Sequence, residues 1–172
     1  MIKNIPGKIY GSIEVFDFNH DGKQDYAING VQFIDGKGFV YKLDLYTNTG
    51  KDFNIEHGWL PGTQNGSFKI LDLNNDNFLD AAVFGYDENQ EPTFTIYKNN
   101  QGTLEISQKL NGIIDGKLAY ADFNADGFLD LVVTGKDEDS NEYLSVLWND
   151  GNGFFTPTVI NAEGLNLSLI HI

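Results

Sequence analysis

The chain has 172 residues and a formal charge of −14, from 25 acidic against 11 basic residues, and it contains no cysteine. A hydrophobic content of 41% with 13% aromatic residues is enough to build a packed core, which argues against disorder. The negative charge disfavours nucleic acid and anionic membrane surfaces as partners, and the lack of cysteine excludes disulfides and thiolate sites. No apolar run predicts membrane insertion, and residues 1–7 lack the apolar segment of a secretion signal.

Three nine-residue segments, at 17–25, 72–80 and 122–130, share the pattern Asp-x-Asn-x-Asp-(Gly/Asn)-x-x-Asp. The first residues of the segments, at 17, 72 and 122, recur at a spacing typical of the repeats of propellers and solenoid proteins. The residues upstream fall into the same register, which metal-loop convergence alone would not produce. The aligned positions are Gly7, Gly62 and Gly112, then Gly11, Gly66 and Gly116, and also Ile5, Leu60 and Leu110.

Each repeat predicts four strands. The first strand alternates apolar and polar residues and runs directly into the loop. One face of this strand carries two apolar or aromatic residues and the first loop aspartate: Ile13, Val15 and Asp17 in the first repeat, Phe68, Ile70 and Asp72 in the second, and Leu118, Tyr120 and Asp122 in the third. The second is a continuous apolar run that indicates burial on both faces. We expect the second strands at 26–30, 81–85 and 131–135, the third at 39–46, 93–97 and 143–148, and the fourth at 53–56, 103–107 and 154–159.

No stretch has helical periodicity, so the sequence predicts an all-β protein with about three four-stranded antiparallel blades of a β-propeller. The repeats run approximately over 5–57, 58–107 and 108–160, and 161–172 is the start of a truncated fourth repeat or a tail. Closed propellers typically have about four to eight blades. We therefore expect part of a larger propeller, with further blades supplied by a parent chain or an oligomer.

The nine-residue segments have the chemistry of calcium loops. Oxygen side chains at positions 1, 3, 5 and 9, with a turn residue at position 6, suit a cation that takes about six to eight oxygen ligands. EF-hand and dockerin-type loops need a carboxylate at position 12, where this chain has Ile28, Val83 and Val133. Ligation is expected to close at position 9 instead, with the backbone carbonyl of position 7 as a further ligand. An Asx-rich turn without metal is the alternative.

Each repeat resembles the FG-GAP or VCBS-type repeat of integrin α-subunit propellers. The resemblance rests on the first strand, the aspartate loop, and the segment that leaves the loop, which consists of Asp, three apolar residues and Gly. The resemblance covers nearly the whole chain, and it implies that each loop links the first two strands of a blade and holds Ca²⁺, about three ions in all. Asn77 replaces the turn glycine, so we expect the second loop to bind most weakly. The implied ligands are Asp17, Asn19, Asp21, Lys23 and Asp25; Asp72, Asn74, Asp76, Phe78 and Asp80; and Asp122, Asn124, Asp126, Phe128 and Asp130.

The resemblance also implies a non-catalytic module at the cell surface or outside the cell that recognises protein or carbohydrate. No nucleophile, phosphate or Cys/His motif is found. His20, at loop position 4, is expected to face solvent, Trp148 to pack in the core, and Trp59 to be the better candidate for surface recognition. Two alternatives remain: the propeller part of a secreted polysaccharide lyase or hydrolase, and a structural spacer without a ligand.

Overall fold

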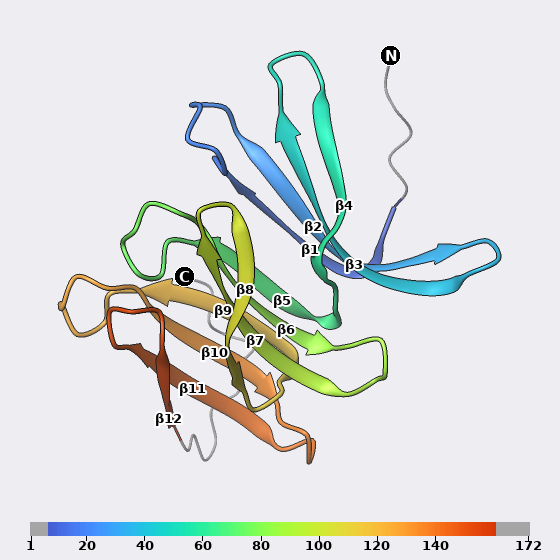
Figure 1. The fold of residues 1–172 in the computed structure, drawn as a ribbon. Coiled ribbons are helices and arrows are strands. Elements are labelled where there is room, and N and C mark those ends of the chain that lie inside the picture. Colours follow the sequence, from blue (N-terminus) through green and yellow to red (C-terminus); the bar gives the residue numbers. More distant parts are fainter. Residues whose placement is uncertain (1–6, 161–172) are drawn as a thin grey trace.

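The computed structural model describes residues 7–160, which form twelve β-strands in three four-stranded sheets (Figure 1). Ile5 and the expected fourth repeat at 161–172 lie outside the described residues. The first sheet contains β1 (Ile9–Phe16), β2 (Asp25–Ile34), β3 (Gly38–Asn48) and β4 (Phe53–Pro61). The second contains β5 (Gln64–Leu71), β6 (Asp80–Tyr86), β7 (Pro92–Asn100) and β8 (Thr103–Leu110), and the third β9 (Ile114–Ala121), β10 (Asp130–Lys136), β11 (Glu142–Asn149) and β12 (Phe155–Val159).

All strand pairs are antiparallel, and each sheet follows the chain order of its strands. The first strands of the three sheets, β1, β5 and β9, are neighbours in space, so the sheets fan out from a common edge (Figure 1). This arrangement is that of consecutive propeller blades, and the all-β prediction is confirmed. The three blades do not close a ring. Within residues 7–160, no helix has the length and apolar character that a membrane crossing requires.

The second blade is buried on both faces, as its continuous apolar strand predicts. Ala81 and Val83 of β6 pack in a core cluster shared with the first blade, whereas Ala82 and Phe84 pack in a cluster shared with the third. Side chains alternate across a strand, so one strand supplies both clusters. The hydrophobic core of the molecule therefore lies between the blades.

The incoming face of the first blade is uncovered in the described residues. Ile13 and Val15 are 58% and 62% exposed, although Phe68 and Ile70, at the same positions of the second blade, are buried against the first. The sequence pattern predicts on which face of the sheet these side chains lie. It does not predict how exposed they are, because their exposure depends on whether a neighbouring blade covers that face.

The same irregularity recurs at the start of the first strand of each blade. The register shifts by a β-bulge between Ile9 and Ser12, and at the equivalent points of the pairings of β5 with β6 and of β10 with β9. A Cβ on Gly66 would lie 1.8 Å from the Phe84 carbonyl oxygen, so the bulge closes only around glycine. The aligned glycines of the sequence thus have a steric cause.

Two features of the first two blades differ from the predicted strands. The β2–β3 hairpin extends beyond its counterparts and carries an exposed edge-to-face pair, Phe33 and Phe39, near its tip. The fourth strands β4 and β8 continue past their predicted ends at residues 56 and 107, because they run almost directly into the next blade.

An ion pair covers part of the otherwise open face of the first blade. The Lys8 ammonium lies 2.9 Å from an Asp44 carboxylate oxygen, and both side chains are almost fully buried. The same ammonium donates to the carbonyls of Ile28 and Lys42, and the Gly58 N–H donates to Asp44. Burial raises the pKa of Asp44, but the Lys8 and Gly58 contacts outweigh it, and the pKa lies below its usual value.

Candidate functional site: three aspartate loops and an axial groove

The three aspartate loops lie at one end of the blades, where the first strand of each turns into the second. Their position-6 residues all have left-handed backbone conformations, with φ of 81° at Gly22, 67° at Asn77 and 90° at Gly127. Asn tolerates this conformation better than most residues, so the second loop keeps the same turn as the others.

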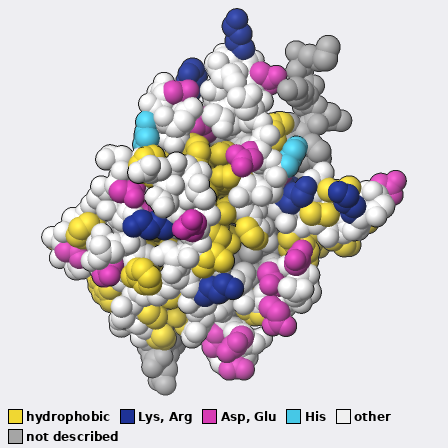
Figure 2. All heavy atoms as spheres, viewed as in Figure 1, with side chains coloured by type: hydrophobic (Ala, Val, Ile, Leu, Met, Phe, Trp, Pro, Cys, Tyr) yellow, Lys and Arg dark blue, Asp and Glu magenta, His cyan; other side chains and the backbone are white. Residues whose placement is uncertain are grey.

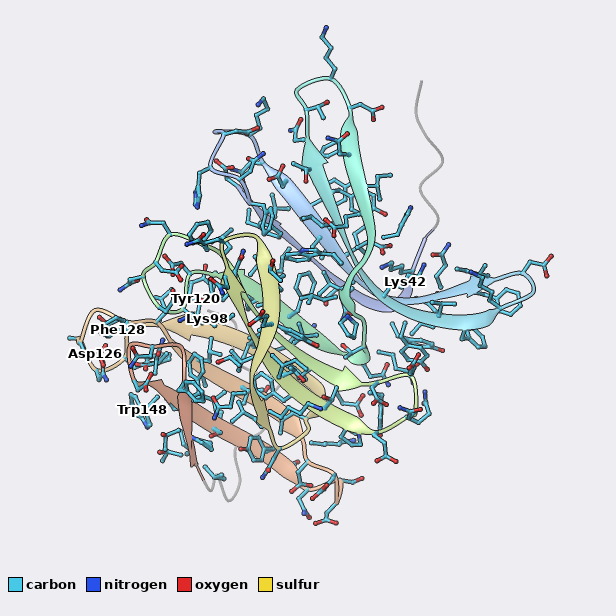
Figure 3. All side chains as sticks on the ribbon, in the orientation of Figure 1. Lys42, Lys98, Tyr120, Asp126, Phe128 and Trp148 are labelled. Atoms are coloured by element: carbon cyan, nitrogen blue, oxygen red, sulfur yellow. The ribbon has the colours of Figure 1, made fainter. Side chains whose placement is uncertain are left out.

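The side chains at positions 1, 3 and 5 turn into the loop. In the third loop, the oxygens of Asp122 and Asn124 both accept the N–H of Asp126, at 3.1 and 3.0 Å. Asp126 in turn accepts the N–H of Phe128, whose place in the loop is visible in Figure 3. The first and second loops repeat these three bonds. Carboxylate and amide oxygens, the donors that Ca²⁺ prefers, therefore converge three times over.

The aspartate at position 9 has a different environment, because it is buried at the base of the loop. The two oxygens of Asp130 accept the backbone N–H groups of Phe123 and Asn149, at 3.1 and 2.9 Å. Asp25 and Asp80 make the same pair of bonds in their own blades. The carboxylate thus ties the loop to the end of the third strand. A carboxylate has about four lone-pair sites, so these two bonds leave capacity for a cation.

The second loop carries uncompensated negative charge. Burial raises the pKa of Asp80 to about 6, against the lowering effect of its two backbone bonds, and the nearby Asp76 and Asp72 raise it further. Among residues 7–160, no three His, Cys, Asp or Glu side chains gather in an arrangement ready to hold a metal ion. The loop acids are held by backbone N–H groups, so a cation would have to take the place of some of these contacts.

The first loop contains a lysine whose ammonium group pairs with one of the loop carboxylates. The Lys23 ammonium, at position 7, lies 2.8 Å from Asp21, and its hydrogen bond holds the pKa of that carboxyl below its usual value. The other two loops have Phe78 and Phe128 at this position. The family resemblance gave a role only to the backbone carbonyl of Lys23. The structure shows that its side-chain ammonium pairs with Asp21, a predicted calcium ligand.

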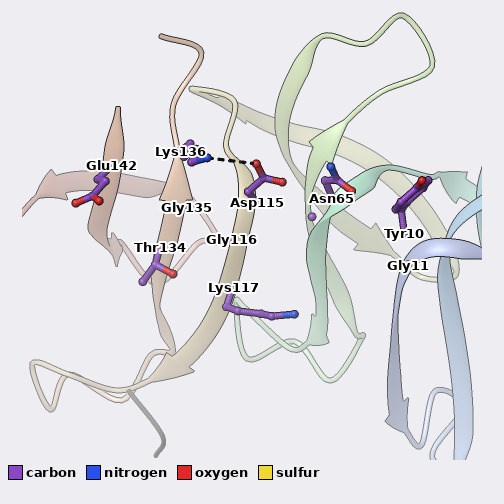
Figure 4. Close-up of a pocket in the computed structure, with 11 residues that line it drawn as sticks. Tyr10, Gly11, Asn65, Asp115, Gly116, Lys117, Thr134, Gly135, Lys136 and Glu142 are labelled. Carbon is purple, nitrogen blue, oxygen red and sulfur yellow. Dashed lines mark ion pairs between the residues drawn. The ribbon is translucent and has the colours of Figure 1, made fainter. Parts of the chain in front are cut away.

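A groove of about 590 Å³, called the axial groove below, lies at the opposite end of the blades and is lined by residues from all three blades (Figure 4). Each bulge displays one side chain there, Tyr10, Asn65 or Asp115, with φ of 54°, 52° and 52°. Lys117 and Lys136 add positive charge, and Lys136 lies 3.8 Å from Asp115. The groove was not predicted from the sequence. The signal that could have located it is the residue before each second aligned glycine, since Tyr10, Asn65 and Asp115 all line the groove.

Comparison with protein families gives one match. The model of the FG-GAP-like repeat matches residues 72–133. The chain carries an FG-GAP-like repeat. The matched FG-GAP-like segment begins at Asp72, the first residue of the second loop, and ends in β10 after the third loop. Neither the curated proteins nor the solved structures gave a significant match.

Neighbouring aspartate loops contact one another, and His20 faces solvent as expected but also makes one of these contacts. This residue is exposed, but its Nε2 donates to the carbonyl oxygen of Asn77 in the second loop, at 2.9 Å. Trp59 is half-buried rather than displayed: it packs against the core cluster between the first two blades and edge-on against Phe18. Trp148 is also half-buried, and its indole N–H donates to Thr158.

Proposed function

We propose that the chain is a calcium-stabilised β-propeller module of FG-GAP type, in which each aspartate loop binds one Ca²⁺. The observation that carries this proposal is the threefold convergence of the oxygens at positions 1, 3 and 5, whose chemistry suits a hard cation. The position-9 aspartates and the position-7 carbonyls complete the donor set. The ion would neutralise carboxylates that repel one another across a tight turn.

The loops are expected to differ in affinity. The second has Asn77 at the turn, and in the first the Lys23 ammonium competes with calcium for Asp21. The third loop has neither feature and should bind most tightly. Replacing Lys23 by Phe, the residue of the other two loops, should strengthen binding by the first.

The test is thermal unfolding in Ca²⁺, in Mg²⁺ and in chelator, together with calorimetric titration. A ligand that binds only the folded state stabilises it by about 2.7 kcal/mol at a hundredfold excess over Kd. Asp21→Ala and Asp126→Ala should lower the melting temperature in Ca²⁺ much more than in chelator. No heat of Ca²⁺ binding, or equal losses in both buffers, would reject the calcium role.

We further propose that the module binds a protein or carbohydrate ligand outside the cell and performs no chemistry. The axial groove supports this role, since it collects exposed polar side chains and one aromatic ring from three blades. Acidic side chains gather at the β6–β7 and β10–β11 turns, at the same end of the blades as the groove (Figure 2), which disfavours polyanions such as nucleic acid. Calcium-dependent binding on a glycan array would support the proposal, and Asn65→Ala should weaken it.

The exposed Ile13 and Val15 support a further proposal, that another blade covers the first one in the assembled propeller. The counterparts of Ile13, which are Phe68 and Leu118, are buried at blade interfaces. At the position of Val15, Ile70 is buried and Tyr120 is 49% exposed.

A further inference from the structure

Consecutive aspartate loops are joined by the same hydrogen bond, made by different residue types. His20 Nε2 donates to the carbonyl oxygen of Asn77 at 2.9 Å, and Asn75 Nδ2 donates to that of Gly127 at 3.2 Å. Both donors are at position 4 of their loop, and both acceptors are at position 6 of the next. A bond that recurs with unlike side chains follows from how the blades are stacked.

The accepting residue is itself bonded to the first predicted ligand of its loop. The N–H of Asn77 donates to Asp72 at 2.8 Å, and that of Gly127 donates to Asp122 at 2.9 Å. A continuous path therefore runs from the position-4 side chain of one loop, through the turn of the next, to a carboxylate of that next loop.

The backbone presents position 4 in the same way in all three loops. His20, Asn75 and Ala125 have φ of 56°, 58° and 61°. Ala125 has no side-chain donor, and no fourth loop follows it in the described residues. The third loop is thus a natural example of position 4 without the contact.

We propose that His20 and Asn75 are positioning residues that couple calcium binding between neighbouring loops. An ion in one loop orders its position-4 side chain, which holds the turn and first carboxylate of the next loop in their binding arrangement. By linkage, occupation of the second loop favours the first to the same extent. This inference rests on the proposed calcium binding, and its test separates the two.

The test follows each loop by its own amide in ¹⁵N–¹H correlation spectra during titration of the 172-residue chain with CaCl₂. The amides of Gly22, Asn77 and Gly127 report the first, second and third loops. In Asn75→Ala, which places the alanine of the third loop in the second, the Gly127 midpoint should rise by roughly fivefold or more, the lower range of couplings between sites. Asn75→His, which copies the first loop, should keep the parental midpoint.

A double-mutant cycle shows whether the coupling comes from the bound ion. Asp76→Asn weakens binding by the second loop and should raise the Gly127 midpoint by a similar factor, and adding Asn75→Ala should then change it little. An unchanged Gly127 midpoint in Asn75→Ala, or an equal shift in the two Asn75 variants, overturns the coupling but leaves calcium binding in place. If none of the three amides responds to Ca²⁺, both the coupling and the proposed function are rejected.

Discussion

The position-9 aspartate should stabilise the fold even without calcium, which distinguishes it from the other loop acids. Asp130 is fully buried, and its two oxygens satisfy the N–H groups of Phe123 and Asn149. Asp130→Ala leaves both donors without an acceptor. A buried donor left unsatisfied costs about 1–3 kcal/mol, so the expected loss is about 2–6 kcal/mol in the free energy of unfolding. This is a large part of the about 5–15 kcal/mol typical of a domain.

The matched control is Asp126→Ala in the same loop. Asp126 is exposed, and water can replace its contacts with Phe128 and Asn124, so the loss in chelator should stay within about 0.5 kcal/mol. Both variants should lose the calcium-dependent increment. Urea unfolding in excess chelator, followed by circular dichroism and tryptophan fluorescence, measures the difference.

If Asp130→Ala does not fold, Asp130→Asn provides the second measurement, because the amide keeps one acceptor oxygen and should lose less. Equal losses for Asp130→Ala and Asp126→Ala in chelator would refute the reasoning, since they would show that the two backbone bonds contribute nothing measurable to stability.

Three further predictions concern the blades themselves. Gly66→Ala should cost at least about 2 kcal/mol, because the new methyl group overlaps the Phe84 carbonyl, whereas Gly7→Ala, with open space around it, should change the melting temperature little. Lys8→Ala and Asp44→Ala should each cost about 3–5 kcal/mol, with a double variant that loses less than their sum, and additive losses would contradict a coupled pair. Because the pKa of Asp44 lies below its ordinary value of 3.8, its contribution is complete at higher pH and is lost as the pH falls below 3.8, so the urea midpoints of the parent chain and Asp44→Asn should converge in acid.

Most strands could be predicted because alternation, apolar runs and turn residues are local signals. The third strand of the second blade was expected at 93–97 and is observed at Pro92–Asn100, and most of the others agree to a similar degree, whereas β2 and β4 extend further. The extended first hairpin was missed, although Phe33 and Phe39 flank an Asp-Gly pair that is a recognised hairpin signal.

The contacts that the sequence could not reveal join residues far apart in the chain. His20 meets Asn77 only because neighbouring blades place position 4 of one loop beside position 6 of the next. The Lys8–Asp44 pair likewise depends on how the chain enters the first blade. The structural role of Asp130 was hidden for another reason, since an aspartate at this position can serve either as a metal ligand or as an acceptor for backbone N–H groups.

The bulges at the groove suggest how such a module could change specificity. Tyr10, Asn65 and Asp115 share one backbone conformation but have unrelated side chains, while the glycines beside them are fixed by steric contact. If the groove binds a ligand as proposed, substitutions at these three sites by residues that tolerate a left-handed backbone should alter the recognised molecule with little effect on the blades. A combinatorial library of Asn, Asp, His and Gly at these sites would vary the groove without adding backbone strain.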